Sequence, residues 1–411
     1  MNPTEGGSRT CVLVLAAGAP WESTALPALT GRPGMVVLKR CVDVTDLMAA
    51  ATTGEASVAV LSLDAPGLDA AAVHHLRLHG IEPVAVLADP AREDLRDRLH
   101  RLGMRFAIGV AQVDHLPDAV LAAAAADHQD SEPTREGPAV GPGRGRTIVV
   151  WGPTGAPGRT TVALAVAGEL ARRGAAPLVL DIDPWGGSVG QHLGVLDEVS
   201  GLLACARTAA AGDLPGAYLG LQRRVAGLRV ITGLPRPDRW VEVRSGVVDQ
   251  LIDLGRRQGE VVVDTGFALE EDLSAELAGR PGRNGMTLEA IAAADDLVVV
   301  GSADPVGLSR LARGLVELRE LTGGRPVHVV INRMRASLGW SESDVAGMLG
   351  GFAELAGLHF LPDDRATTDR ALLAGRMLSE LGESSLSRAV AALVDGLRPG
   401  TGRVSKRRLR S

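Results

Sequence analysis

Residues 147–174 of this chain read TIVVWGPTGAPGRTTVALAVAGELARRG. The run 147–150 is rich in β-branched residues, which predicts a buried β-strand. A loop with three glycines and two prolines follows, and after it Thr160 and Thr161 begin an alanine-rich helical pattern that Gly174 can close. A strand, a glycine-rich loop and a helix in this order are typical of a phosphate-binding loop, in which backbone N–H groups at a helix N-terminus hold the anion.

The loop departs from the usual phosphate-binding pattern at two positions. Arg159 stands where the motif has a lysine, and Pro153 stands at its first glycine position. Gly155 and Gly158 permit backbone conformations and a close approach of phosphate that a Cβ would block. Thr160 is placed to bind Mg²⁺ through its hydroxyl group, and Arg159 to reach a β- or γ-phosphate. Taken alone, the stretch is also compatible with an ordinary tight turn between a strand and a helix.

The composition of the 411 residues indicates two or three globular domains, since 45% of them are hydrophobic and 22% are charged. Aromatic residues make up only 2%, so we expect a core of Ala, Val and Leu. A formal net charge of −6 excludes nucleic-acid binding over the whole surface, though not through a local patch. The three cysteines lack Cys-x-x-Cys spacing and indicate buried thiols. Without a signal-peptide pattern or an apolar run of ~20 residues, we expect a cytoplasmic protein.

Residues 1–125 alternate short apolar runs with helical patterns, which predicts a parallel, doubly wound sheet. Five strand-and-helix units in this length resemble the layout of the receiver domain of response regulators. The expected strands are Cys11–Ala16, Met35–Cys41, Ser57–Leu63, Pro83–Leu87 and Arg105–Val110, with helices such as Val44–Ala51 and Ala91–Leu102 between them.

This layout lacks the residues of a receiver that can be phosphorylated. Ala16, Ala17 and Gly18 stand where a receiver has its Mg²⁺-binding acidic pair, and Ser62 stands at its aspartate position. Asp64 is acidic but lies out of register, and no lysine follows the fifth expected strand. We therefore predict a degenerate receiver-like domain that serves docking or dimerisation, with phosphorylation of Asp64 as the alternative.

A polar segment rich in Pro and Gly at residues 126–146 predicts a flexible linker. A second α/β pattern covers residues 147–397, and a basic tail follows at 398–411. The fold class is thus α/β, with two doubly wound parallel-sheet domains, the second of them a P-loop NTPase domain. Its expected strands are Ile148–Trp151, Pro177–Asp181, Leu228–Thr232, Glu260–Asp264, Asp296–Gly301, Val327–Ile331 and His359–Leu361. Its expected helices are Thr160–Arg173, Val247–Arg257, Thr287–Ala294, Pro305–Leu321, Ser341–Leu349, Thr368–Ala374 and Ser385–Leu397.

Polar residues stand at the ends of several expected strands of the second domain, where parallel sheets bind ligands. Asp181 and Asp183 follow one strand, and at positions i and i+2 of an extended segment their carboxylates point the same way. Val261–Asp264 has the form of a Walker B strand, whose aspartate holds Mg²⁺ through water. Asn332 and the loop Pro362–Asp364 are placed where a base could be read. Each of these signals alone is compatible with a polar strand end.

In order and spacing, these motifs together resemble the ParA/MinD superfamily of deviant Walker A P-loop ATPases. The family signature K-G-G-x-G-K-T-T aligns with T-G-A-P-G-R-T-T at 154–161, and its Walker B motif with 261–265. Its D-x-D-P motif aligns with 181–184, its late Asn-Arg with 332–333, and its I-P-x-D loop with 361–364. A receiver-like domain before the ATPase domain is similar to the CpaE/TadZ branch, which positions pilus machinery, and to actinobacterial septum-site-determining proteins.

The resemblance implies a site for ATP and Mg²⁺, and a homodimer that forms when nucleotide binds. It implies catalytic roles for Asp183, which would orient the attacking water, and for Arg159. It implies metal binding by Thr160, Asp181 and Asp264. The implied nucleotide-binding residues are Gly155, Ala156, Gly158, Arg159, Thr160, Thr161, Asn332, Arg333, Pro362 and Asp364.

Four departures from the family pattern fall on the phosphate loop. Thr154 and Ala156 replace a lysine and a glycine, while Pro157 removes an N–H group. Arg159 keeps the charge of the second lysine on a larger, planar group. The carboxylates at 181, 183 and 264 are intact. A missing cation weakens the transition state more than ground-state binding, by ~10³-fold in related chemistry, so we expect nucleotide binding with slow hydrolysis.

We predict a nucleotide-dependent positioning protein that recruits pilus, secretion or division proteins at a cell pole or septum. Two alternatives stay open, a nucleotide-free scaffold and a chromosome or plasmid partition ATPase that binds DNA. The basic tail, with Arg398 and Lys406 among its cations, suggests a membrane or DNA contact, but a solvated run of charge is the simpler interpretation.

Overall fold

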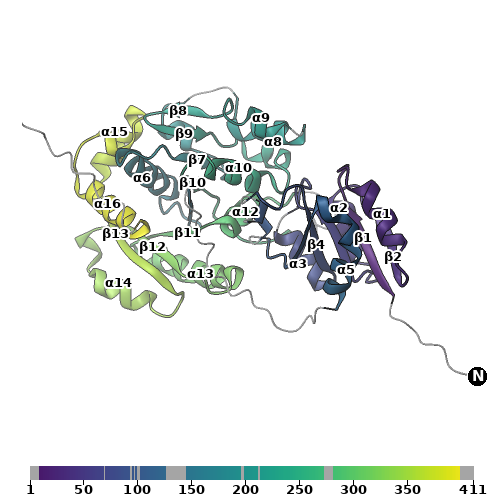
Figure 1. The fold of residues 1–411 in the computed structure, drawn as a ribbon. Helices are drawn as coiled ribbons and strands as arrows, with labels where there is room; N and C mark the ends of the chain where they lie inside the picture. Colours follow the sequence, from purple (N-terminus) through teal and green to yellow (C-terminus); the bar gives the residue numbers. More distant parts are fainter. Residues whose placement is uncertain are drawn as a thin grey trace, which may run out of the picture. The chain divides into compact units, whose positions relative to one another are not determined.

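The chain folds into two compact units, each with its own sheet, in the computed structural model (Figure 1). The first unit contains the described residues up to 125 together with 244–247, 272, 281 and 282, and the second contains the other described residues from 145 onward. The structure describes residues 9–68, 70–92, 95–96, 98–99, 102–125, 145–195, 199–211, 213–272 and 281–398.

The first unit has a five-stranded sheet in the order β2-β1-β3-β4-β5, with every neighbouring pair parallel. This is the flavodoxin-like order of doubly wound folds, and apolar clusters fill both faces of the sheet. The elements are β1 (Thr10–Leu15), α1 (Glu22–Thr30), β2 (Met35–Arg40), α2 (Val44–Ala51), β3 (Val58–Ser62), α3 (Ala70–Leu78), β4 (Glu82–Leu87), β5 (Phe106–Gly109), η1 (Val110–His115) and α5 (Leu116–Ala124).

Asp43 and Asp89, at the carboxyl ends of β2 and β4, are exposed and accept from the N–H groups of Asp46 and Ala91. After β1 the chain turns through Ala17 and Gly18, whose φ angles of 50° and 81° are left-handed. Ser62 is buried at the end of β3, while Asp64 is exposed. Among the described residues, no group of three or more His, Cys, Asp or Glu side chains is placed to hold a metal ion. Docking or dimerisation through this unit stays a prediction.

The second unit has an eight-stranded sheet in the order β13-β12-β11-β6-β10-β7-β9-β8, parallel except for the antiparallel edge strand β8. Its strands are β6 (Thr147–Trp151), β7 (Leu178–Asp181), β8 (Arg223–Val225), β9 (Leu228–Ile231), β10 (Val261–Asp264), β11 (Asp296–Ser302), β12 (Val327–Met334) and β13 (Leu355–Pro362). Its helices are α6 (Arg159–Arg172), α7 (Val189–His192), α8 (Gly201–Ala210), α9 (Leu214–Ala217), η2 (Pro237–Glu242), α10 (Val247–Arg256), α12 (Gly285–Ala293), α13 (Pro305–Thr322), η3 (Ala336–Leu338), α14 (Glu342–Leu349), α15 (Arg365–Ala374), η4 (Leu378–Glu380) and α16 (Ser385–Leu397).

Helices cover both faces of this larger sheet. On one face α6 packs beside α16 (Figure 1). Alternate strand residues such as Ile148 and Val150 belong to the apolar cluster that includes residues of these helices. On the other face Trp151 lies against Gly314 of α13, where a Cβ would come within 2.9 Å of the indole ring. The prediction of an α/β chain with two doubly wound parallel sheets is confirmed.

Most expected strands lie within a few residues of the observed ones. The short edge strand β8 was missed because its arginines carry no alternating pattern, and α8 was missed because alanine-rich runs of this length give a weak periodic signal. Part of the expected helix Ala91–Leu102 lies outside the described residues, as do residues 126–144 of the linker and 399–411 of the tail.

The two ends of the second unit are held by ion pairs to buried or partly buried carboxylates, which corrects two expectations. Arg146, expected in the linker, donates to both carboxylate oxygens of Asp296 at 2.8 and 3.1 Å. Arg398, expected in a solvated tail, is buried, donates to Asp296 at 2.8 Å and also pairs with Glu260. These cations sit where strands β6, β10 and β11 begin, so they belong to the folded unit rather than to exposed basic segments.

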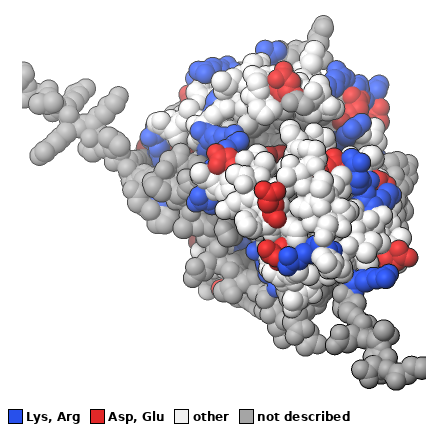
Figure 2. All heavy atoms as spheres, turned by 45° about the vertical axis from the view of Figure 1, so that its right-hand side comes forward, with Lys and Arg blue, Asp and Glu red and all other residues white. Residues whose placement is uncertain are grey.

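Charges of both signs are interspersed over the described part of the face in Figure 2. A broad basic surface is therefore not a feature of that face. None of the described helices combines the length and the hydropathy needed to cross a membrane.

Candidate functional site

The loop between β6 and α6 has the backbone geometry of a phosphate cradle. Gly155 and Gly158 have φ angles of 105° and 102°, and α6 begins directly afterwards at Arg159. At Gly152 a Cβ would lie 2.3 Å from the carbonyl oxygen of Val300, so only glycine fits there. Ala156 also adopts a left-handed φ of 52°, which costs roughly 1–2 kcal/mol for a residue with a Cβ. Strain of this kind is common in binding loops.

Asn332, at the end of β12, supports this loop from the side. Its Nδ2 donates to the carbonyl oxygen of Pro157 at 2.8 Å, and its Oδ1 accepts from the N–H of Arg333 at 2.9 Å. A Cβ on Gly158 would lie 2.5 Å from the same Nδ2. Asn332 was expected to contact the nucleotide; in the structure its Nδ2 holds the loop and its Oδ1 is bonded to the neighbouring backbone N–H.

A hydroxyl and a buried carboxylate meet at the first turn of α6. Thr160 donates through Oγ1 to Oδ2 of Asp264 at 2.7 Å, and Ser188 donates to Thr160 at 3.2 Å. The other oxygen of Asp264, Oδ1, is buried and has no hydrogen-bond partner among the described residues. Burial, followed by the nearby Asp181, raises the pKa of Asp264 well above its usual range.

This arrangement fits a hard divalent cation. A buried carboxylate oxygen without a donor is costly, and a cation would remove that cost. Thr160 and Asp264 would hold Mg²⁺ here, directly or through water, beside the loop. The bound ion would offset part of the negative charge of a phosphate chain.

Asp181, the third expected metal residue, faces the protein backbone. Its carboxylate accepts from the N–H groups of Val189 at 3.0 Å and Asp183 at 3.3 Å. Gly187 and Gly233 make room for it, since a Cβ on either would approach it within 2.7 or 2.5 Å. Burial raises the pKa of Asp181 to about 7. Asp181 thus anchors the start of α7, beside which Ser188 reaches Thr160.

Arg159 lies in a closed set of acceptors. Its Nε donates to the carbonyl oxygen of Thr265 at 3.1 Å, and its Nη1 to those of Gly152 at 3.2 Å and Pro153 at 3.4 Å. Its Nη2 pairs with Oδ2 of Asp183 at 3.4 Å, and both side chains are nearly buried. To reach a phosphate, the guanidinium group would have to leave these acceptors.

Asp183 has both carboxylate oxygens engaged in the same arrangement. Oδ1 accepts from the N–H of Trp185 at 2.9 Å, and Oδ2 accepts from Arg159. Each oxygen keeps a lone pair for a further donor, so Asp183 can still accept from a water, as its expected role requires. The paired cation makes the carboxylate a weaker base than a free one.

An aromatic cluster that the sequence analysis missed covers Arg159. Phe267 stacks on Trp185 at 5.2 Å between ring centroids, and the Arg159 guanidinium lies 5.9 Å from the Phe267 ring. Arg283 lies over Trp185 at 4.4 Å and over Trp240 at 5.5 Å. The chain has only five tryptophans and four phenylalanines. Because these residues are rare here, their positions after the expected strands could have marked this edge of the sheet in the sequence.

A cavity of about 320 Å³ opens beside the loop and gathers most of the expected nucleotide residues. Asp364 at its rim also caps α15 by accepting from the N–H of Thr367 at 3.1 Å. The cavity is lined by loop, β12 and β13 residues that include Gly158, Thr161, Asn332, Arg333, Pro362 and Asp364. Predicted residues far apart in sequence are thus brought to one place, next to the cradle.

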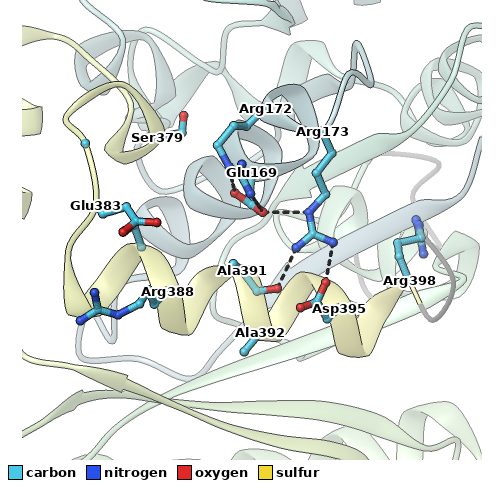
Figure 3. Close-up of a pocket in the computed structure, with 12 residues that line it drawn as sticks. Glu169, Arg172, Arg173, Ser379, Glu383, Arg388, Ala391, Ala392, Asp395 and Arg398 are labelled. Carbon is cyan, nitrogen blue, oxygen red and sulfur yellow. Dashed lines mark hydrogen bonds and ion pairs between the residues drawn. The ribbon is translucent and has the colours of Figure 1, made fainter. Parts of the chain in front are cut away.

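A larger cavity of about 910 Å³ lies at the other end of α6 and is lined by paired charges (Figure 3). Glu169 accepts from Arg172 at 2.6 Å and from Arg173 at 2.8 Å, and Arg173 reaches Asp395 of α16 at 2.7 Å. Arg173 thereby joins the end of α6 to α16, and Figure 3 shows it reaching Asp395 and the carbonyl oxygen of Ala391. Despite its size, this cavity is separate from the phosphate loop, which adjoins the first turn of α6.

Comparison with known proteins gave similarities in structure only, since no family model and no curated protein matches this chain. The MinD cell division ATPase of Pyrococcus furiosus is 18% identical over 62% of this chain and 98% of its own, with a TM-score of 0.49. A ParA family ATPase from Chlorobium tepidum is 16% identical over 61% and 98%, with a TM-score of 0.48. Apo McdA from Cyanothece is 20% identical over 62% and 99%, with a TM-score of 0.47. Identities of this size imply no activity for this chain.

Proposed function

We propose that the second unit binds Mg-ATP at the carboxyl edge of its sheet and hydrolyses it slowly. One observation carries the proposal: buried Asp264 has an oxygen without a donor, and its other oxygen is bonded to Thr160 in the first turn after a phosphate cradle. Such a carboxylate is stabilised by a cation, and the cradle offers N–H groups to an anion at the same point. A metal-bound phosphate chain satisfies both.

Slow hydrolysis follows from the cations of the loop. Thr154 carries no charge, and Arg159 is bonded to three carbonyl oxygens and to Asp183. The paired cation also makes Asp183 a weaker acceptor for the attacking water, although its carboxylate keeps free lone pairs. The site can thereby bind ATP without hydrolysing it quickly. A protein whose partners distinguish its ATP-bound state needs that state to persist.

Calorimetry of ATP binding with and without Mg²⁺, on the full chain, tests the binding part. The expected result is binding that weakens when Mg²⁺ is removed, and the absence of any ATP binding would reject it. Phosphate release tests the second part. Turnover near ~1 s⁻¹ or faster that is lost on Asp183→Ala would show that Asp183 is free to act.

At the level of the cell, we propose a ParA/MinD-like positioning protein that forms a homodimer with ATP and recruits pilus, secretion or division proteins at a pole or septum. The order of motifs supports this role. A fluorescent fusion that stays diffuse, together with light scattering that finds the same mass with and without ATP, would reject it. Salt-dependent retention on DNA would instead favour a partition ATPase.

A nucleotide-free scaffold is the second candidate, and the contacts of Arg159 favour it. A guanidinium group bonded to three carbonyl oxygens and Asp183 stabilises the loop without any ligand. The calorimetric titration above separates this candidate from the first.

A further inference from the structure

A second arginine reaches the tip of the phosphate loop from another part of the chain. Arg310 lies in α13, and its guanidinium group packs against Gly155: a Cβ at position 155 would lie 2.1 Å from Nη1 and 3.2 Å from Cζ. The two residues are far apart in sequence, so the sequence motif of the loop does not predict this contact. Glycine at 155 leaves the space that the guanidinium group fills.

Close packing of α13 on the sheet brings Arg310 to this position. Gly307 lies so near Ser302 that a Cβ would come within 2.5 Å of its carbonyl oxygen. One turn beyond Arg310, Gly314 lies against the ring of Trp151. A Cβ added at Gly314 would also lie 3.4 Å from Pro153. Gly307 thus lets α13 approach the end of β11, and Gly314 lets it approach the end of β6, where the loop begins.

The two arginines at the loop differ in how their charges are used. Arg159 is bonded to three carbonyl oxygens and to Asp183. Arg310 is half-buried and makes no hydrogen bond or ion pair with any residue that the structure describes. A guanidinium group has five N–H donors in a planar fork that matches phosphate oxygens. Arg310 is therefore the arginine at the loop whose N–H donors are available for a ligand.

We propose that Arg310 is the cation that binds the phosphate chain of the nucleotide, from within the same chain, while Arg159 holds the loop. The inference rests on the proposed nucleotide site and assigns its anion contact to a residue outside the loop. A polyphosphate held by backbone N–H groups alone keeps several negative charges, and a guanidinium group beside Gly155 can neutralise one of them with paired hydrogen bonds. Thr154 and Pro157 carry no charge that could do so.

Arg310→Ala tests this assignment, with Arg313→Ala as the matched control. Arg313 lies on the same helix, is exposed and, among the described residues, donates only to its own helix at the carbonyl oxygen of Ser309. Affinities for ATP and for AMP are measured by calorimetry on the full chain in the presence of Mg²⁺. The comparison isolates the contact, because AMP lacks the β- and γ-phosphates.

For Arg310→Ala we expect ATP affinity to fall about 10- to 100-fold and AMP affinity to change less than about twofold, as for one lost charge-assisted contact. Arg310→Lys should keep part of the ATP affinity, and Arg313→Ala all of it. Unchanged ATP affinity in Arg310→Ala, or an equal loss for ATP and AMP, would overturn the assignment and leave the nucleotide site intact. Wild-type protein that binds neither ligand would reject the nucleotide site itself, and the assignment with it.

Discussion

The two sheets of this chain are built alike and differ in what stands at their carboxyl ends. Both are doubly wound and parallel, an architecture that gathers loops at that edge. In the first unit the gathered loops offer three exposed aspartates, Asp43, Asp64 and Asp89, of which the first and last accept from nearby backbone N–H groups. In the second they offer Asp183, Asp264 and Arg159, which lie buried or nearly buried in contact with one another or with the loop. Both edges carry charge, and only the second combines buried charges with a phosphate cradle.

At their amino ends, in contrast, the two sheets carry the same arrangement of charges, a buried carboxylate between two arginines. Glu82 at the start of β4 is buried between Arg77 and Arg105, and Asp296 at the start of β11 is buried between Arg146 and Arg398. Charge at this end serves folding, because every group is paired. Charge at the other end of the second sheet is left partly unpaired, which is the mark of a binding site.

The largest expected effect is on stability, at the amino end. Arg398→Ala leaves Glu260 and Asp296 with less compensation, and because Arg398 is 8% exposed we expect the second unit to lose about 3 kcal/mol. Arg105→Ala in the first unit should cost about 1 kcal/mol, since Arg105 is 39% exposed and Arg77 still holds Glu82. Hydrogen exchange, read peptide by peptide, measures both. Equal losses of unfolding free energy in the two variants would show that the exposure of the arginine does not decide how much its ion pair contributes.

The second effect concerns binding at the carboxyl ends. Asp264→Ala should weaken Mg-ATP binding about 100-fold, or ~2.7 kcal/mol, because the buried metal ligand is removed. Asp64→Ala is the counterpart in the first unit and should leave the affinity unchanged. Calorimetry with and without Mg²⁺ decides, since the Asp264 variant should also lose its dependence on the ion. A variant that binds ATP as tightly as wild type would remove Asp264 from the site.

The third effect is a pH dependence that the first unit should lack. Burial raises the pKa of Asp181 to about 7, so the folded second unit binds a proton that the unfolded chain has lost above pH 4. The stabilising contribution is present at low pH and is lost as pH rises through 7. Relative to Asp181→Asn, we expect wild type to lose about 2 kcal/mol of unfolding free energy between pH 5 and 7. Urea denaturation at each pH measures the difference, and parallel curves would contradict it.

How much of the fold and of the site could be predicted from the sequence depends on how far apart along the chain the contacting residues lie. The strands, the loop and the acids that follow β7 and β10 are local patterns, and the structure brings Thr161 and Asp364 to one cavity as the order of motifs predicts. Arg310 and Ser188 were missed because they reach the site through packing of a helix or a turn. Arg398 was assigned to the exposed basic tail because its carboxylate partners, Glu260 and Asp296, lie far from it in sequence.

The smallest effect compares two strained alanines, one at each carboxyl edge. Ala17 and Ala156 have φ angles of 50° and 52°, which glycine adopts freely. Ala17→Gly and Ala156→Gly should each stabilise their unit by about 0.5 kcal/mol, since relief of strain exceeds the entropy that glycine adds to the unfolded chain. Hydrogen exchange should find the two gains equal. Only Ala156→Gly should also change ATP affinity, because only that turn lies in a phosphate cradle. A change of ATP affinity in Ala17→Gly would mean that the two edges are coupled, and no change in either would mean that the strain at Ala156 has no part in binding.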